Sequence, residues 1–121
     1  MKTALTILAA VLLSVSGLMA EPTAKPNASL AKKLDSIIIP HVEFYTANIN
    51  DAVRDIANYS RHSDPAKKGV EIILLDRGNQ VEISIDKRNI SVHNVLKRVA
   101  EITGARLEYE GQKVILGRPV S

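Results

Sequence analysis

Three histidines are the residues of this sequence best suited to acid–base chemistry or metal binding near neutral pH. His41 follows a proline at the start of a strand-like segment, His62 lies in a charged stretch, and His93 falls in the first turn of a helix-like segment, off its apolar stripe. A metal site needs a second histidine or a carboxylate at ligand spacing, and the sequence places none beside these three. We therefore expect solvated surface histidines and predict no metal site.

The remaining reactive groups support the same expectation. Ser63 and Asp64 stand next to His62, but a triad needs a folded scaffold to hold its members at hydrogen-bond range, which adjacency does not provide. Asp51 and Asp55 are four residues apart and could share a metal ion, although Asp51 is better explained by the favourable charge at a helix start. The chain has no cysteine, and its glycines separate elements without forming a phosphate loop. We predict no enzyme activity and no cofactor.

The composition favours one small domain with an aliphatic core. Of the 121 residues, 45% are hydrophobic but only 3% are aromatic. The formal net charge is only +3, and basic pairs occur in four separate segments. These pairs are Lys32-Lys33, Lys67-Lys68, Lys87-Arg88 and Lys97-Arg98. A nucleic-acid surface would gather them on one face with aromatic platforms, so we expect no nucleic-acid partner.

The first 20 residues have the pattern of a cleaved export signal. A basic second residue precedes an apolar run at 4–15, and small residues follow, with cleavage expected after Gly17 or Ala20. A membrane-spanning helix would need about 20 apolar residues, and Ser14 and Gly17 interrupt this run. We therefore expect a mature protein that is soluble outside the cytoplasm.

Residues 21–36 contain two prolines and small polar residues, which is typical of a linker. Leu30, Leu34 and Ile37 have helical spacing, so a short helix could form within it. The domain itself is expected to span 37–119.

Hydrophobic periodicity predicts the elements of this domain. Strands are expected at 41–46, 70–75, 81–85, 107–110 and 113–116, with a tight turn at Gly111, and helices are expected after the caps Asn48 and Ser91, the second ending at Gly104. The strand at 70–75 is apolar almost throughout, which favours a place at the centre of a sheet or between two layers.

The two helical segments repeat one pattern. When Ile49 is aligned with Val92, the apolar positions of both helices and their polar caps coincide. The expected fold class is α+β, built from duplicated β-α-β units in the order β-α-β-β-α-β-β, with two helices packed between two small sheets.

The second half combines a β-stretch at 81–85, a polar turn, a capped amphipathic helix and a β-hairpin after a glycine. Its characteristic runs are Asn89-Ile90-Ser91-Val92, Val95-Leu96, Val99-Ala100, Thr103-Gly104 and Lys113-Val114-Ile115. This pattern resembles the short N-terminal domain shared by secretins and TonB-dependent outer-membrane transducers. The first half, from 34–40 through Val42-Glu43-Phe44 to Asp64-Pro65, is similar to a version common in exported proteins of the Verrucomicrobia and Planctomycetes group.

The resemblance covers about 37–119 and implies a periplasmic protein–protein interaction domain. Its partner would be another envelope protein, either a secretion-system component or a signalling regulator, and the membrane would be met only through that partner. Because the sequence reaches Ser121 without a pore domain, a TonB box or a barrel, we expect a stand-alone adaptor or a truncated relative.

We expect the partner to bind at an open strand edge. The candidates are the first strand, with Val42, Phe44 and Thr46, and the last strand, with Lys113 and Ile115. Two alternatives stay open: self-pairing of two copies at these edges, and a small ligand-binding protein or hydrolase with a site near His41 and the loop at 61–68.

Overall fold

The computed structural model describes residues 22–75 and 79–119, with side chains through residue 117. The predicted signal peptide at 1–20 lies outside these residues. Across the described ranges, no helix is both long and apolar enough to cross a membrane.

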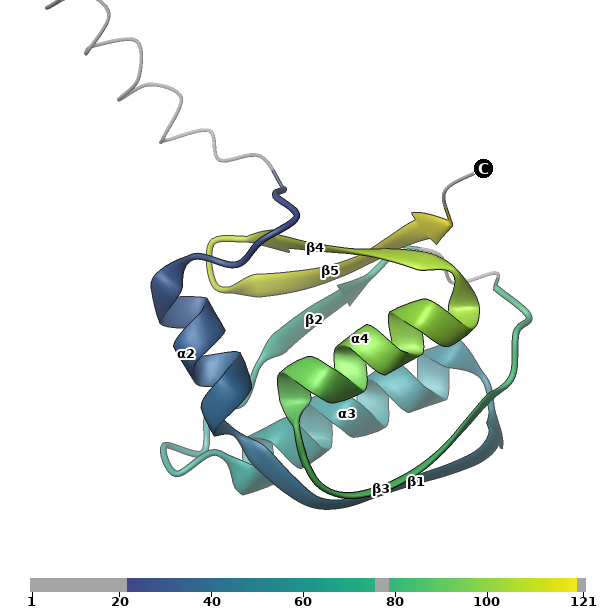
Figure 1. Cartoon of the computed structure of the whole chain (residues 1–121), viewed down its shortest axis with the longest axis horizontal. Helices are drawn as coiled ribbons and strands as arrows, with labels where there is room; N and C mark the ends of the chain where they lie inside the picture. The colour runs from purple at the N-terminus through teal and green to yellow at the C-terminus, as the bar shows by residue number, and fades with distance from the viewer. Residues whose placement is uncertain (1–21, 76–78, 120–121) are drawn as a thin grey trace, which may run out of the picture.

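The described chain contains three helices and five strands (Figure 1). In chain order they are α2 (Ala28–Ser36), β1 (Ile38–Ala47), α3 (Ile49–Ser63), β2 (Glu71–Leu74), β3 (Ile83–Ser91), α4 (Val92–Thr103), β4 (Ala105–Glu110) and β5 (Lys113–Pro119). Helices α3 and α4 lie between two small sheets, and α2 lies at the side. The predicted α+β class, with two helices packed between two sheets, is confirmed.

The sheets have two and three strands. Strands β1 and β3 pair antiparallel, and the second sheet has the order β2-β5-β4, with β5 parallel to β2 and antiparallel to β4. The units β1-α3-β2 and β3-α4-β4 each contribute their first strand to one sheet and their second strand to the other. Strand β1 runs antiparallel to β3, and β2 runs antiparallel to β4. These directions are those expected of two units related by an approximate two-fold rotation.

Both long helices begin as the sequence predicts, and α4 ends as predicted, whereas α3 continues to Ser63, three residues into the loop expected at 61–68. The Asn48 side chain accepts a hydrogen bond from the Asp51 amide at 2.8 Å, and the Ser91 hydroxyl accepts one from the Asn94 amide at 3.1 Å. These bonds satisfy amide donors that have no partner within the helix. Gly104 ends α4 in the left-handed region, at φ 74°, where a side chain would be strained.

The apolar stripes of α3 and α4 meet in one core. Their buried residues include Ile49, Ala52, Val53, Ile56, Val92, Val95, Leu96 and Val99. Both sheets contribute aliphatic side chains to the same cluster, and the ring of Phe44 packs 6.5 Å from that of Tyr59. The predicted aliphatic core between the sheets is confirmed.

Helix α2 corrects the linker expectation for residues 28–36. Leu30 and Leu34 are fully buried in the main cluster, and Asn27 caps the helix by accepting a hydrogen bond from the Leu30 amide at 2.8 Å. The Asn27 side chain also donates to the Gly111 carbonyl at 2.8 Å, which ties the helix start to the β4–β5 hairpin. The packed domain therefore begins before residue 37.

Strand β2 corrects the expectation for 70–75. The apolar run suggested a central strand, but β2 lies at the edge of the three-stranded sheet because β5 inserts between β2 and β4. Leu75, which follows it, is 56% exposed. The last strand is central instead, so the prediction that β5 offers an open edge is wrong.

Burial of α2 predicts a measurable loss of stability. Leu34→Ala should lower the free energy of unfolding by about 2–5 kcal/mol, since it removes a fully buried side chain and leaves a cavity. Lys32→Ala, at an exposed position of the same helix, should change it by no more than about 0.5 kcal/mol. Denaturant unfolding measures both, and equal effects would show that α2 is a dispensable arm.

Candidate functional site

His93 is buried, which corrects its expected place on the surface. Its Nδ1 lies 2.8 Å from an Asp35 carboxylate oxygen and its Nε2 lies 3.0 Å from the Tyr109 hydroxyl. Because a carboxylate accepts, Nδ1 donates to Asp35, and in the tautomer that carries its only proton on Nδ1 the ring accepts from the Tyr109 hydroxyl at Nε2. These hydrogen bonds connect α2, α4 and β4. They were not predicted from the sequence, because residues 21–36 were expected to be a linker.

This environment changes the acidity of Tyr109. Burial, and secondly the Asp35 carboxylate, raise the pKa of its hydroxyl above the ordinary value of 10.0. Tyr109 is only 4% exposed, so the hydroxyl has no access to a substrate. We interpret Asp35, His93 and Tyr109 as a structural tie that holds α2 against the domain.

Residues 61–63 of the expected loop belong to α3, and the loop that follows the helix is organised by Asp64. Its carboxylate accepts hydrogen bonds from the amides of Gly69 at 2.9 Å, Ala66 at 3.0 Å and Lys68 at 3.2 Å. These bonds, that from Gly69 foremost, hold the pKa of Asp64 below its ordinary value of 3.8. Asp64 is therefore the anchor of this loop, with its carboxylate oxygens bound to main-chain amides.

The other expected site residues do not converge on this loop. His62 is exposed, as predicted, with Nδ1 2.9 Å from the Asn58 carbonyl oxygen. His41 is half-buried and contacts Asp86. Among the described residues, no hydrogen bond or ion pair joins His41 to residues 61–68.

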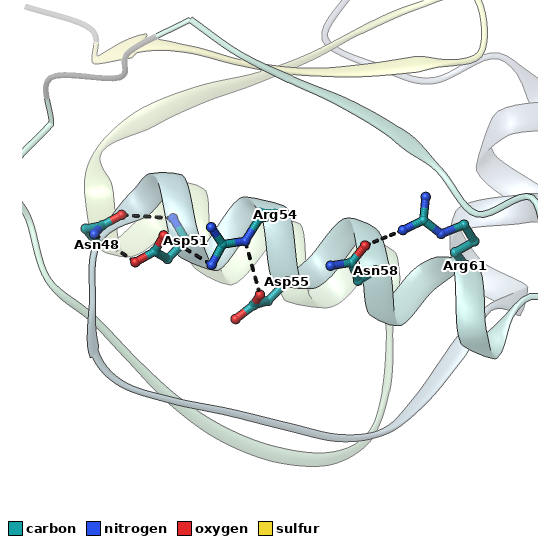
Figure 2. Close-up of polar contacts among 6 residues, drawn as sticks. All are labelled: Asn48, Asp51, Arg54, Asp55, Asn58 and Arg61. Atoms are coloured by element: carbon teal, nitrogen blue, oxygen red, sulfur yellow. Dashed lines mark hydrogen bonds and ion pairs between the residues drawn. The ribbon is translucent and has the colours of Figure 1, made fainter.

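Polar side chains cover the exposed face of α3 (Figure 2). The Arg54 guanidinium lies between two carboxylates, 3.2 Å from Asp51 and 3.7 Å from Asp55. Further along the helix, Arg61 donates to the Asn58 side chain. The two carboxylates that could have shared a metal ion are thus paired with an arginine.

A hollow of about 630 Å³ lies where β3 meets α4. Lys87 and Arg88 line it, but the Ser91 hydroxyl caps α4 and the Asp35 carboxylate is bound to His93. The hollow is therefore lined by two basic side chains and by the start of α4, where the Ser91 hydroxyl already accepts the hydrogen bond of the Asn94 amide.

The predicted partner-binding residues of β1 face mainly inward. Val42 is fully buried and Phe44 is 6% exposed, so neither side chain can reach a partner. Thr46 is exposed, but it sits at an irregularity of the strand with φ 49°. In β5, Lys113 is exposed and Ile115 is buried within the central strand.

The open edge of the three-stranded sheet is β2. At the opposite edge, Thr23 and Tyr109 exchange two main-chain hydrogen bonds of 2.8 Å, so the N-terminal segment covers part of β4. No strand of the described chain pairs with the outer side of β2. The Leu75 amide donates to the Leu116 carbonyl, and main-chain groups alternate in direction along a strand. Those of Ile72 and Leu74 therefore face away from β5.

A second hollow, of about 310 Å³, lies beside this edge. It is lined by Val53 and Arg54 with Asn50 of α3, and by Ile72 and Leu74 of β2. An edge with unpaired main-chain groups beside a partly apolar hollow can bind an extended peptide. Sequence reasoning missed β2 because strand order within a sheet is not visible in a local pattern.

No protein-family model, curated protein or solved structure matches this chain.

The Asp64 anchor predicts a specific response to acid. Because the folded-state pKa of Asp64 is below 3.8, its stabilising contribution is fully present above that pH and is lost as the pH falls below it. Asp64→Asn should lower stability at neutral pH and flatten its decline in acid, whereas the exposed control Glu82→Gln should retain the wild-type decline. Denaturant unfolding at pH values from about 2 to about 7 measures the stability of each variant. If the stability of Asp64→Asn declined in acid as steeply as that of the wild type, the prediction would be contradicted.

The open edge predicts alternating amide protection. Amides of Ile72 and Leu74 should exchange with solvent much faster than those of Ile73 and Leu75, which face β5. Hydrogen exchange followed by NMR measures all four. Equal protection would mean that another segment covers the edge.

Proposed function

We propose that this chain is a non-catalytic interaction module of the bacterial periplasm that binds an extended segment of another envelope protein along β2. The observation that supports this best is the outer edge of β2, with which no other described strand pairs, beside the hollow on α3. Main-chain hydrogen bonds to β2 would provide affinity, and a side chain placed in the hollow would provide specificity.

A comparison of the sheet edges favours β2 as the docking edge. Exposed edges are usually protected by charges, proline or irregular backbone. Strand β1 carries Pro40 and an irregularity near Thr46, and β3 carries Lys87, Arg88 and the positive-φ residue Asn89. Strand β2 carries a charge only at its first residue, Glu71, and continues as Ile72-Ile73-Leu74.

The sequence resemblance supplies the class of partner. Secretin and TonB-dependent transducer domains of this kind meet other envelope proteins, and the N-terminal pattern of this chain favours export. The partner in this proposal is a secretion-system component or an envelope signalling regulator that offers a segment with alternating apolar side chains. Such a segment would place them against Val53, Ile72 and Leu74.

Site-specific photo-cross-linking in the producing cells tests the proposal. A photoreactive amino acid at position 75 should trap an envelope protein, and the trapped peptide should map to an extended segment. Ile72→Lys, which places a charge at the hollow beside Arg54, should abolish the product. A synthetic peptide of that segment should then protect the amides of Ile72 and Leu74 from exchange.

The matched control is Ile38→Lys, which alters an exposed isoleucine of β1 and should leave the product intact. Circular dichroism and thermal melting verify that both variants are folded. A product of two copies of this chain, or equal trapping from position 38, would overturn the proposal.

A further inference from the structure

Three potential metal ligands meet on the outer face of the β1–β3 sheet. His41 and Glu43 are two residues apart on β1, so their side chains share a face. Asp86 of β3 lies directly opposite Glu43. One ligand atom from each of the three lies within 4.8 Å of the others.

The closest pair already shows how the strands direct these side chains. His41 lies opposite Arg88, so its ring reaches diagonally across the sheet to Asp86, and Nε2 lies 2.7 Å from a carboxylate oxygen. Around a tetrahedral zinc ion, with bonds of about 2.0–2.2 Å, ligand atoms lie about 3.4 Å apart. Replacing the shared proton by a metal ion would therefore need only small side-chain rotations at this pair and a closer approach by Glu43.

The arrangement also has an unfavourable feature that a cation would remove. Like charges directly opposite each other destabilise a β-sheet, and Glu43 and Asp86 form such a pair. The Glu43 side chain makes no ion pair or hydrogen bond among the described residues, whereas the Asp86 carboxylate is bound to His41. A divalent ion between the carboxylates would convert this repulsion into attraction.

We propose that His41, Glu43 and Asp86 form a surface site for a divalent transition-metal ion, for which Zn²⁺ is the test ion. Imidazole nitrogen and carboxylate oxygen are both zinc ligands, and three protein ligands leave a further position for water. The His41 side chain is 34% exposed and that of Asp86 68%, so the ion would be accessible from solvent. The site lies on the sheet that does not contain β2, so it is independent of the docking edge.

Isothermal titration of the untagged full chain with Zn²⁺ tests the proposal. One ion should bind per chain, and His41→Ala, Glu43→Gln and Asp86→Asn should each weaken binding by more than about tenfold, since even loss of an outer-shell partner costs about 10–100-fold. NMR should show the largest Zn²⁺-dependent shifts at these three residues. Binding should weaken in acid, because zinc requires the His41 nitrogen without its proton.

Two further variants make the test specific. Arg88→Gln removes a positive charge opposite His41 and should tighten Zn²⁺ binding by about twofold to tenfold. His62→Ala removes an exposed histidine of α3 and should leave the affinity unchanged. The proposal is overturned if Zn²⁺ at about 1 mM does not bind. It is also overturned if His62→Ala abolishes Zn²⁺ binding or if Arg88→Gln weakens it.

Discussion

The structure depends on burying two amphipathic helices from both sides with a core that is almost without aromatic rings. Helix α3 contacts β1 and β2, and helix α4 contacts β3 and β4, so each helix touches both sheets. Burial of apolar surface stabilises a fold by about 25 cal/mol per Å², and neither thin sheet could cover both helices alone. With the apolar side chains drawn to the middle, charged residues are left on the outer faces of the sheets. The side chains available for binding are therefore found there and at the strand edges.

The duplicated units are not equivalent, and their difference creates the open edge. Strand β4 continues through Gly111 into β5, which inserts beside β2, while β2 has no such extension. On its other side, β4 receives the bridge from Thr23 at Tyr109, so β4 has partners on both sides, whereas among the described residues β2 pairs only with β5. An approximate two-fold arrangement thus leaves one asymmetric feature, the outer side of β2.

Local patterns predicted the helices, their caps at Asn48 and Ser91, and the hairpin, because each depends on neighbours within a few residues. Contacts between distant residues were not predictable in this way. Asp35 and His93 are 58 residues apart, and His41 and Asp86 are 45 apart, so only the assembled fold brings them together. The predicted position of β2 in its sheet was wrong for the same reason. Its apolar sequence is typical of a central strand, but β5 lies between β2 and β4 and leaves β2 at the edge. The spacing of Leu30 and Leu34 allowed a short helix at α2, but the packing of that helix into the core was not predicted, because it too depends on contacts between distant residues.

The length of β2 would set the strength of the proposed binding at its edge. Two residues with outward main-chain groups can form about four hydrogen bonds, each contributing about 0.5–1.5 kcal/mol net. One aliphatic side chain buried in the hollow adds about 1.5–3 kcal/mol. Against an association cost of at least about 4 kcal/mol, the sum falls well short of the roughly 8 kcal/mol of a micromolar complex. A single copy would therefore bind its partner only transiently, and lasting attachment would require a longer interface or several copies engaging one assembly, where effective concentration replaces intrinsic affinity.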